Sequence, residues 1–104
     1  MPSVKLSAAE ISYLDEAASN QGHENGGEYP ILLVHGFSSS IKDNWFDTLW
    51  IKFLNDLGLR VIAFDNRGHG HSEKFYSEGD YSLDAMAGDA TDLLDHLEID
   101  KAHI

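Results

Sequence analysis

No cysteine is present among the 104 residues, which excludes disulfide bonds, thiolate nucleophiles and cysteine-based zinc sites. Cations are also scarce, because seven Lys and Arg stand against 18 Asp and Glu and give a formal net charge of −11. Nucleic acids and anionic membrane surfaces are bound through basic patches, so we expect neither as a partner. The longest unbroken apolar run, Ile31–Val34, is too short for a membrane span or a signal peptide. We therefore expect a soluble, cytoplasmic protein.

Strand and helix patterns alternate along the first part of the chain. Short alternating segments on either side of Ser7–Ala9 predict two strands joined by a turn, and the polar, glycine-containing stretch Glu16–Glu28 predicts a loop. The continuous apolar runs Ile31–Val34 and Val61–Phe64 are typical of strands covered on both faces in a parallel sheet. Between them, apolar residues recur at helical spacing from Trp45 to Leu57, so the pattern predicts a strand–helix–strand unit.

The ends of the helices carry their own signals. Asp43 or Asn44 can cap the start of the first helix, and Gly58 can take the left-handed position after its end. Ser82 is the expected N-cap of a second helix, whose apolar residues share one face (Leu83, Met86, Ala87, Ala90, Leu93, Leu94 and Leu97). Residues 101–104 then resemble the start of another strand. Two helices leave much of such a sheet uncovered, so we expect an incomplete α/β domain.

The tripeptide His35-Gly36-Phe37 directly follows the first buried strand. Glycine permits a sharp bend there, and ligands of open α/β sheets bind beside the carboxyl ends of the strands. In such a bend the Phe37 backbone N–H can point into the crevice and donate to a developing oxyanion. The alternative is a plain strand-to-loop turn with a hydrogen-bonded histidine.

The segment Asp65–Ser72 follows the second buried strand in the same way. Its two glycines, Gly68 and Gly70, allow tight backbone turns, and Asp65 and Arg67 can pair with each other or bind exposed backbone groups. The third glycine of a dinucleotide fingerprint and the lysine of a P-loop are both missing, so we predict no nucleotide site.

Histidines and serines near these bends offer two further possibilities. His69 and His71 could supply two metal ligands, but a third would have to be brought close by folding, from Asp65, His35 or His23. We therefore predict no metal and no cofactor. No G-x-S-x-G elbow surrounds Ser38, Ser39, Ser40 or Ser72, so we interpret these serines as loop residues rather than nucleophiles.

Taken together, the motifs resemble the amino-terminal part of the α/β-hydrolase superfamily. In that family one strand ends in an HG-x turn, matched by His35-Gly36-Phe37. The next strand ends in D-x-R-G-x-G-x-S, matched by Asp65, Arg67, Gly68, Gly70 and Ser72. The resemblance implies short antiparallel strands followed by a βαβαβ unit with a parallel sheet. It also implies that residues 1–104 are the amino-terminal part of a single domain whose remainder is their partner.

The resemblance implies a role for each motif. The Phe37 backbone N–H would be one of two oxyanion-hole donors, His35, Gly36 and Ser38 would shape the turn beside the substrate, and the Asp65–Ser72 loop would be scaffold. The nucleophile, the acid and the catalytic histidine would follow Ile104, so we expect residues 1–104 alone to be inactive.

The resemblance also narrows the substrate class. Epoxide hydrolases and haloalkane dehalogenases usually carry a proline soon after the HG-x turn, where this chain has Ser38-Ser39-Ser40. This difference favours a serine esterase or lipase acting on a small ester-like substrate. Two alternatives stay open: a non-catalytic ligand-binding relative that has lost the triad, and a metallohydrolase using His69 and His71.

Overall fold

The computed structural model describes residues 2–17, 29–36 and 38–104. Four strands form one sheet in the order β1-β2-β4-β3, namely β1 (Ser3–Lys5), β2 (Glu10–Glu16), β3 (Ile31–Val34) and β4 (Val61–Phe64). β1 and β2 pair antiparallel, as do β2 and β4, whereas β3 and β4 pair parallel. The predicted amino-terminal strand pair and the predicted parallel neighbours are therefore both confirmed. Most of the predicted loop, residues 18–28, lies outside the described residues.

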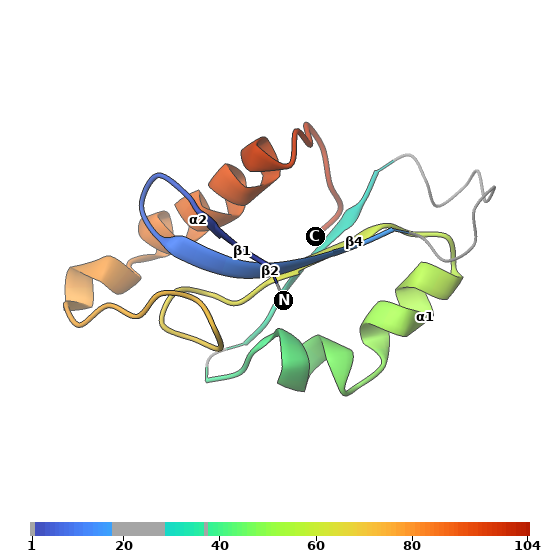
Figure 1. The fold of residues 1–104 in the computed structure, drawn as a ribbon, viewed down its shortest axis with the longest axis horizontal. Coiled ribbons are helices and arrows are strands. Elements are labelled where there is room, and N and C mark those ends of the chain that lie inside the picture. The colour runs from blue at the N-terminus through green and yellow to red at the C-terminus, as the bar shows by residue number, and fades with distance from the viewer. Residues whose placement is uncertain (1, 18–28, 37) are drawn as a thin grey trace.

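The helices α1 (Trp50–Asp56) and α2 (Leu83–His96) cover opposite faces of this sheet (Figure 1). Side chains along a strand alternate between faces, so β4 contributes Val61 and Ala63 to the core beneath α1 and Ile62 and Phe64 to the core beneath α2. Leu54 of α1 belongs to the first cluster and Leu93 of α2 to the second. The continuous apolar run of β4 is thus explained by burial on both sides.

The predicted single helix from Trp45 to Leu57 is wrong in one respect. A five-residue π-helix, η1 (Lys42–Phe46), comes first, and α1 begins only after Leu49, whose φ of 67° is left-handed. A left-handed residue cannot continue a right-handed helix, so the apolar periodicity spans two short helices. The predicted end is confirmed, because Gly58 has a φ of 90°.

The predicted capping of that first helix is also wrong. Asp43 and Asn44 lie inside η1 rather than before it. The Asp43 amide donates to Ser40 Oγ at 3.2 Å, and Asn44 Oδ1 accepts from the Gly36 amide at 3.0 Å. The Asn44 side chain therefore holds the segment after β3 instead of its own helix.

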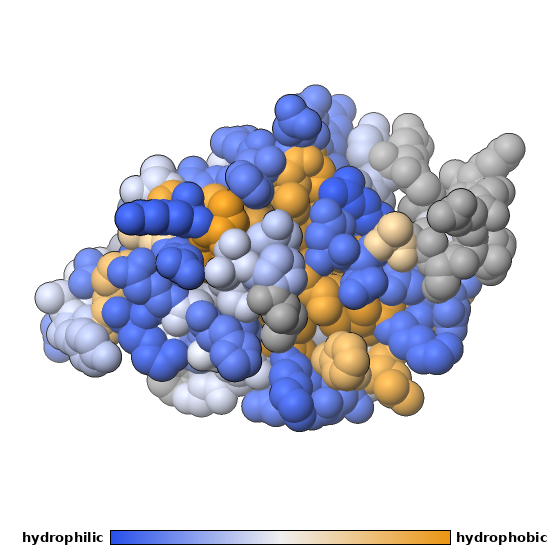
Figure 2. Space-filling model, in the orientation of Figure 1, coloured by the Kyte–Doolittle hydropathy of each residue, from blue (hydrophilic) through white to orange (hydrophobic). Residues whose placement is uncertain are grey.

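Much of the apolar surface around α1 faces outward. In Figure 2 hydrophobic side chains gather from the middle of the view toward the position of α1. Five large side chains of this region are exposed, whereas only Ile51, Leu54 and Asn55 of α1 are buried (exposed: Phe46, Leu49, Trp50, Phe53 and Leu57). The expectation that much of the sheet would be left uncovered is therefore wrong, because all four residues of β4 are buried and the exposed apolar side chains lie on and beside α1 instead.

The second helix begins where the sequence predicts. Ser82 Oγ accepts from the Ala85 amide at 3.1 Å and caps α2, which is preceded by a short 3-10 helix, η2 (Glu78–Tyr81). After α2, the His103 amide donates to the Pro30 carbonyl, and the His103 carbonyl accepts from the Leu32 amide at 2.7 Å. One parallel bridge thus places the last residues beside β3, on the edge away from β4. No helix in the described part of the chain is long and apolar enough to cross a membrane.

Candidate functional site

The segments that follow β3 and β4 start at the same edge of the sheet. Val34 is paired in register with Phe64, and both are the last residues of their strands. His35 and Asp65, the next residue on each chain segment, are 4 % and 1 % exposed. The two sequence motifs therefore meet at the carboxyl ends of neighbouring parallel strands, which is where open α/β sheets bind their ligands.

Asp65 organises the backbone around this edge. Its Oδ1 accepts from the Ile41 amide at 2.8 Å and its Oδ2 accepts from the His71 amide at 3.0 Å. One carboxylate thus holds the chain before η1 and the loop after β4 together. Gly70 lies directly against it, with a φ of 50°, and a Cβ at that position would overlap the carboxylate. Glycine is therefore required there by both space and backbone conformation.

Ser72 closes the same loop onto the antiparallel strand. Its Oγ donates to the Asp65 carbonyl at 2.6 Å and accepts from the Ser12 amide at 2.8 Å. Both groups are buried, so each bond satisfies a backbone group that would otherwise be desolvated. The structure places Ser72 in the scaffold and gives its hydroxyl two backbone partners.

Arg67 pairs with α2 rather than with Asp65. Its Nε and Nη2 donate to the two oxygens of Asp89 at 2.7 and 2.8 Å, and its Nη1 donates to the Asp80 carbonyl at 2.8 Å. The side-chain hydrogen bond and charge of Asp89 raise the pKa of the Arg67 guanidinium above its ordinary value. The guanidinium carbon also lies 4.9 Å from the centre of the Phe75 ring. This bidentate pair fixes the loop after β4 to the helix that follows it.

Asp89 was not predicted as a site residue, although its spacing from Leu93 indicates that it lies on the buried face of α2. It lies four residues before Leu93 in α2, and residues four apart share one helix face. Leu93 is fully buried, so a carboxylate one turn earlier needs a buried cationic partner. Arg67 is the cation that the described structure brings to it.

Two histidines at the site, His35 and His69, contact backbone groups through both ring nitrogens. His35 Nε2 accepts from the Asn66 amide at 2.9 Å, and His35 Nδ1 lies 2.8 Å from the Gly36 carbonyl. His69 Nε2 accepts from the Ser38 amide at 3.1 Å, and His69 Nδ1 lies 3.0 Å from the Arg67 carbonyl. Within the described ranges, no three His, Asp or Glu side chains form a group that could hold a metal ion.

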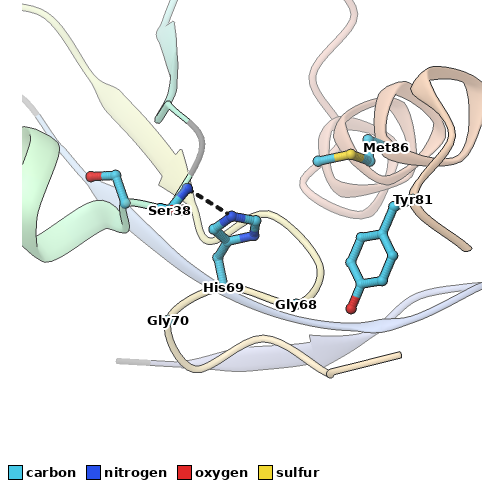
Figure 3. Close-up of a pocket in the computed structure, with 7 residues that line it drawn as sticks. Ser38, Gly68, His69, Gly70, Tyr81 and Met86 are labelled. Atoms are coloured by element: carbon cyan, nitrogen blue, oxygen red, sulfur yellow. Dashed lines mark hydrogen bonds between the residues drawn. The ribbon is translucent and has the colours of Figure 1, made fainter. Parts of the chain in front are cut away.

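A hollow of about 610 Å³ opens between the two strand-end segments and the start of α2. Figure 3 shows the His69 ring beside Ser38, with Tyr81 and Met86 across the hollow. Its lining comes from the segment after β3, the loop after β4 and the residues around the start of α2 (Ser38, Ser39, Gly68, His69, Gly70, Tyr81 and Met86). A Cβ on Gly68, whose φ is 79°, would overlap the Tyr81 ring. The hollow has polar groups on one wall and apolar groups on the other.

The structure brings together the predicted site residues that it describes, which are all of them except Phe37. His35, Gly36 and Ser38 lie at the end of β3 and contact the loop formed by Asp65–Ser72 or the neighbouring η1. Phe37 lies outside the described residues, so its predicted oxyanion role stays a prediction. Asn44, which holds the Gly36 amide, was not expected as a site residue because it is eight positions away along the chain.

A sequence comparison now identifies the fold family. The alpha/beta hydrolase fold family matches residues 29–104. The chain belongs to the α/β hydrolase fold family. The family and the fold predicted from the two motifs are both confirmed.

Individual relatives of this α/β hydrolase carry several activities. The dihydrolipoyllysine-residue acetyltransferase component of the acetoin cleaving system of Pseudomonas putida is 42 % identical over 87 residues, which cover 78 % of this chain and 21 % of that protein. Epoxide hydrolase B of Mycobacterium tuberculosis is 32 % identical over 77 residues, which cover 71 % and 20 %. A solved meta-cleavage product hydrolase of Pseudomonas fluorescens IP01 has a TM-score of 0.75 at 30 % identity, covering 100 % of this chain and 34 % of that one. The chain thus spans between a fifth and about a third of the length of these relatives.

Proposed function

We propose that these residues form the amino-terminal part of the catalytic domain of a serine hydrolase that cleaves a carboxylic ester or a related acyl bond. The observation that carries the proposal is the parallel pairing of Val34 with Phe64. This pairing brings the segments after both strands to one edge of the sheet, beside the hollow lined by Ser38 and His69. In the proposed reaction a serine supplied by the rest of the domain attacks the acyl carbon, and backbone donors at this edge stabilise the oxyanion.

We assign one of those donors to the backbone N–H of Phe37. The amides on either side are already used, because the Gly36 amide donates to Asn44 Oδ1 and the Ser38 amide donates to His69 Nε2. Neither can therefore donate to a substrate oxyanion without breaking a bond that the structure holds. Between two amides with fixed partners, that of Phe37 is the donor we propose.

Ser38-Ser39-Ser40 supports an acyl substrate, because the family resemblance associates a proline in this place with epoxide and haloalkane chemistry. Epoxide hydrolysis is the second candidate, favoured by the relative of 32 % identity named an epoxide hydrolase. The exposed apolar side chains around α1, such as Trp50 and Phe53, support the proposal that the remainder of the domain packs against this segment.

The test uses the complete protein, with turnover of p-nitrophenyl acetate as the readout. Phe37→Pro removes the amide hydrogen, and we expect kcat to fall by about 10²–10³. Phe37→Ala keeps the amide, so its kcat should stay within about tenfold of the wild-type value. Thermal unfolding of both variants checks that each is folded.

Active-site labelling keeps the test decisive if Phe37→Pro does not fold. A fluorophosphonate probe should label one serine of the complete wild-type protein. A folded Phe37→Pro variant with wild-type turnover overturns the oxyanion assignment. Hydrolysis of styrene oxide without fluorophosphonate labelling overturns the serine mechanism in favour of epoxide chemistry. A protein that binds p-nitrophenyl acetate and styrene oxide but turns over neither overturns both the serine mechanism and the epoxide alternative.

A further inference from the structure

Each of the segments after β3 and β4 contributes a histidine that accepts a hydrogen bond from the backbone of the other segment. His35 Nε2, in the first segment, accepts from the backbone amide of Asn66 in the second segment at 2.9 Å. His69, in the second segment, accepts from the Ser38 amide of the first at 3.1 Å. The two rings lie 5.2 Å apart, centre to centre. We call this reciprocal arrangement of His35 and His69 the histidine clasp.

The partners of the histidine clasp fix the protonation of both rings. A backbone N–H can only donate, so Nε2 of each histidine must be unprotonated. Each ring is therefore neutral and carries its hydrogen on Nδ1, where it donates to the Gly36 carbonyl from His35 and to the Arg67 carbonyl from His69. Each imidazole thus links the backbone of its own segment to the backbone of the other, and protonation of Nε2 would break that link.

The two members of the clasp differ in their surroundings. His35 is 4 % exposed, and its own carbonyl accepts from Asn66 Nδ2 at 3.2 Å. His69 lines the hollow, where Figure 3 shows its ring bonded to Ser38 and facing the space in front of Tyr81 and Met86. His69 is therefore the member at the place where the proposed substrate binds.

Ser38 needs the bond from the clasp because its backbone is strained. Its φ of 62° lies in the left-handed region, which is unfavourable for residues other than glycine. Among the described residues, two hydrogen bonds hold this bend, namely the Ser38 amide to His69 Nε2 and the Ser39 amide to the Gly36 carbonyl at 3.1 Å. The first of these depends on a side chain and can be altered by substitution.

We propose that His69 is a positioning residue of this hydrolase. Its neutral imidazole holds Ser38, which directly follows the proposed oxyanion donor along the chain, in the left-handed conformation. The inference rests on the proposed function, since a displaced donor matters only if an oxyanion forms there. Misplacing a donor by about 1 Å in an active site lowers turnover by about 10²-fold.

The kinetic test compares two substitutions of His69 in the complete protein. His69→Phe keeps the ring but removes the acceptor, whereas His69→Gln offers a side-chain oxygen at about the reach of Nε2. We expect His69→Phe to lower kcat by about 10- to 100-fold with little change in KM, and His69→Gln to recover most of that loss. The same two changes at His71, an exposed residue of the same loop, are the matched controls and should leave kcat unchanged. A folded His69→Phe variant with wild-type kcat, or equal losses for Phe and Gln, overturns the inference.

Nuclear magnetic resonance tests the bond itself without an activity readout. In complete protein labelled with ¹⁵N at serine and histidine, we expect a coupling across the hydrogen bond between the Ser38 amide nitrogen and His69 Nε2, and a proton on His69 Nδ1. Absence of the coupling, or a proton on Nε2, overturns the inference whatever the activity. A Phe37→Pro variant with normal turnover instead overturns the proposed function and leaves the coupling in place, so the two failures are distinguishable.

Discussion

Removing one partner of the buried Arg67–Asp89 pair should strongly destabilise the protein. The two side chains are 4 % and 1 % exposed and share two hydrogen bonds of 2.7 and 2.8 Å. Asp89→Ala leaves a guanidinium buried without its carboxylate, and Arg67→Met leaves the carboxylate without its cation. Losing one half of a buried ion pair costs about 3–5 kcal/mol, which is a large part of the roughly 5–15 kcal/mol that stabilises a typical domain.

A double-mutant cycle separates the pair from the surrounding packing. Arg67→Met combined with Asp89→Ala removes both charges, so the double variant should lose less stability than the sum of the two single variants, by about 2–3 kcal/mol. Urea unfolding followed by circular dichroism gives each free energy. The exposed Lys52–Asp56 pair is the control, and Lys52→Ala should change the free energy of unfolding by less than about 0.5 kcal/mol. Single losses below about 1 kcal/mol, or strictly additive ones, would show that the pair does not hold the loop to α2.

Two backbone predictions can be measured by the same urea unfolding. Gly70→Ala places a Cβ against the Asp65 carboxylate at a φ of 50° and should lower the free energy of unfolding by about 2–4 kcal/mol. Gly79→Ala is the control and should be nearly neutral, because its Cβ meets no atom within 4 Å. Equal effects of the two substitutions would contradict the claim that position 70 requires glycine. Leu49→Gly relieves a left-handed residue that is 62 % exposed and should stabilise by about 1 kcal/mol, whereas Leu57→Gly, at a φ of −79°, should destabilise by about 0.5–1 kcal/mol. The same sign for both leucines would refute strain at Leu49.

Features set by local pattern were predictable from the sequence. The apolar runs of β3 and β4 predicted parallel neighbours because continuous apolar runs are typical of the strands of a parallel sheet. Ser82 and Gly58 marked helix ends because their capping chemistry depends on adjacent backbone groups alone. The meeting of the two motifs followed from the same parallel topology.

Features set by particular backbone angles or long-range partners were not predictable. Apolar periodicity from Trp45 to Leu57 does not report the left-handed turn at Leu49, so one helix was predicted where two short ones occur. The periodicity also did not show which side of α1 faces the sheet, and Trp50 and Phe53 are exposed.

At the site, the partners missed by sequence reasoning lie far along the chain. Asp89 is 22 positions from Arg67, and His69 is 31 positions from Ser38. No local pattern specifies such pairs, because they depend on how the loops approach one another after the sheet has formed. The oxyanion role of Phe37 stays a prediction.

The most direct test of the central claim is a crystal structure of the complete protein after reaction with a phosphonate ester. We predict phosphorus bonded to a serine beyond Ile104, with the phosphonyl oxygen about 2.7–3.1 Å from the backbone nitrogen of Phe37. A phosphonyl oxygen held by other groups, or a protein that forms no adduct, would contradict the account.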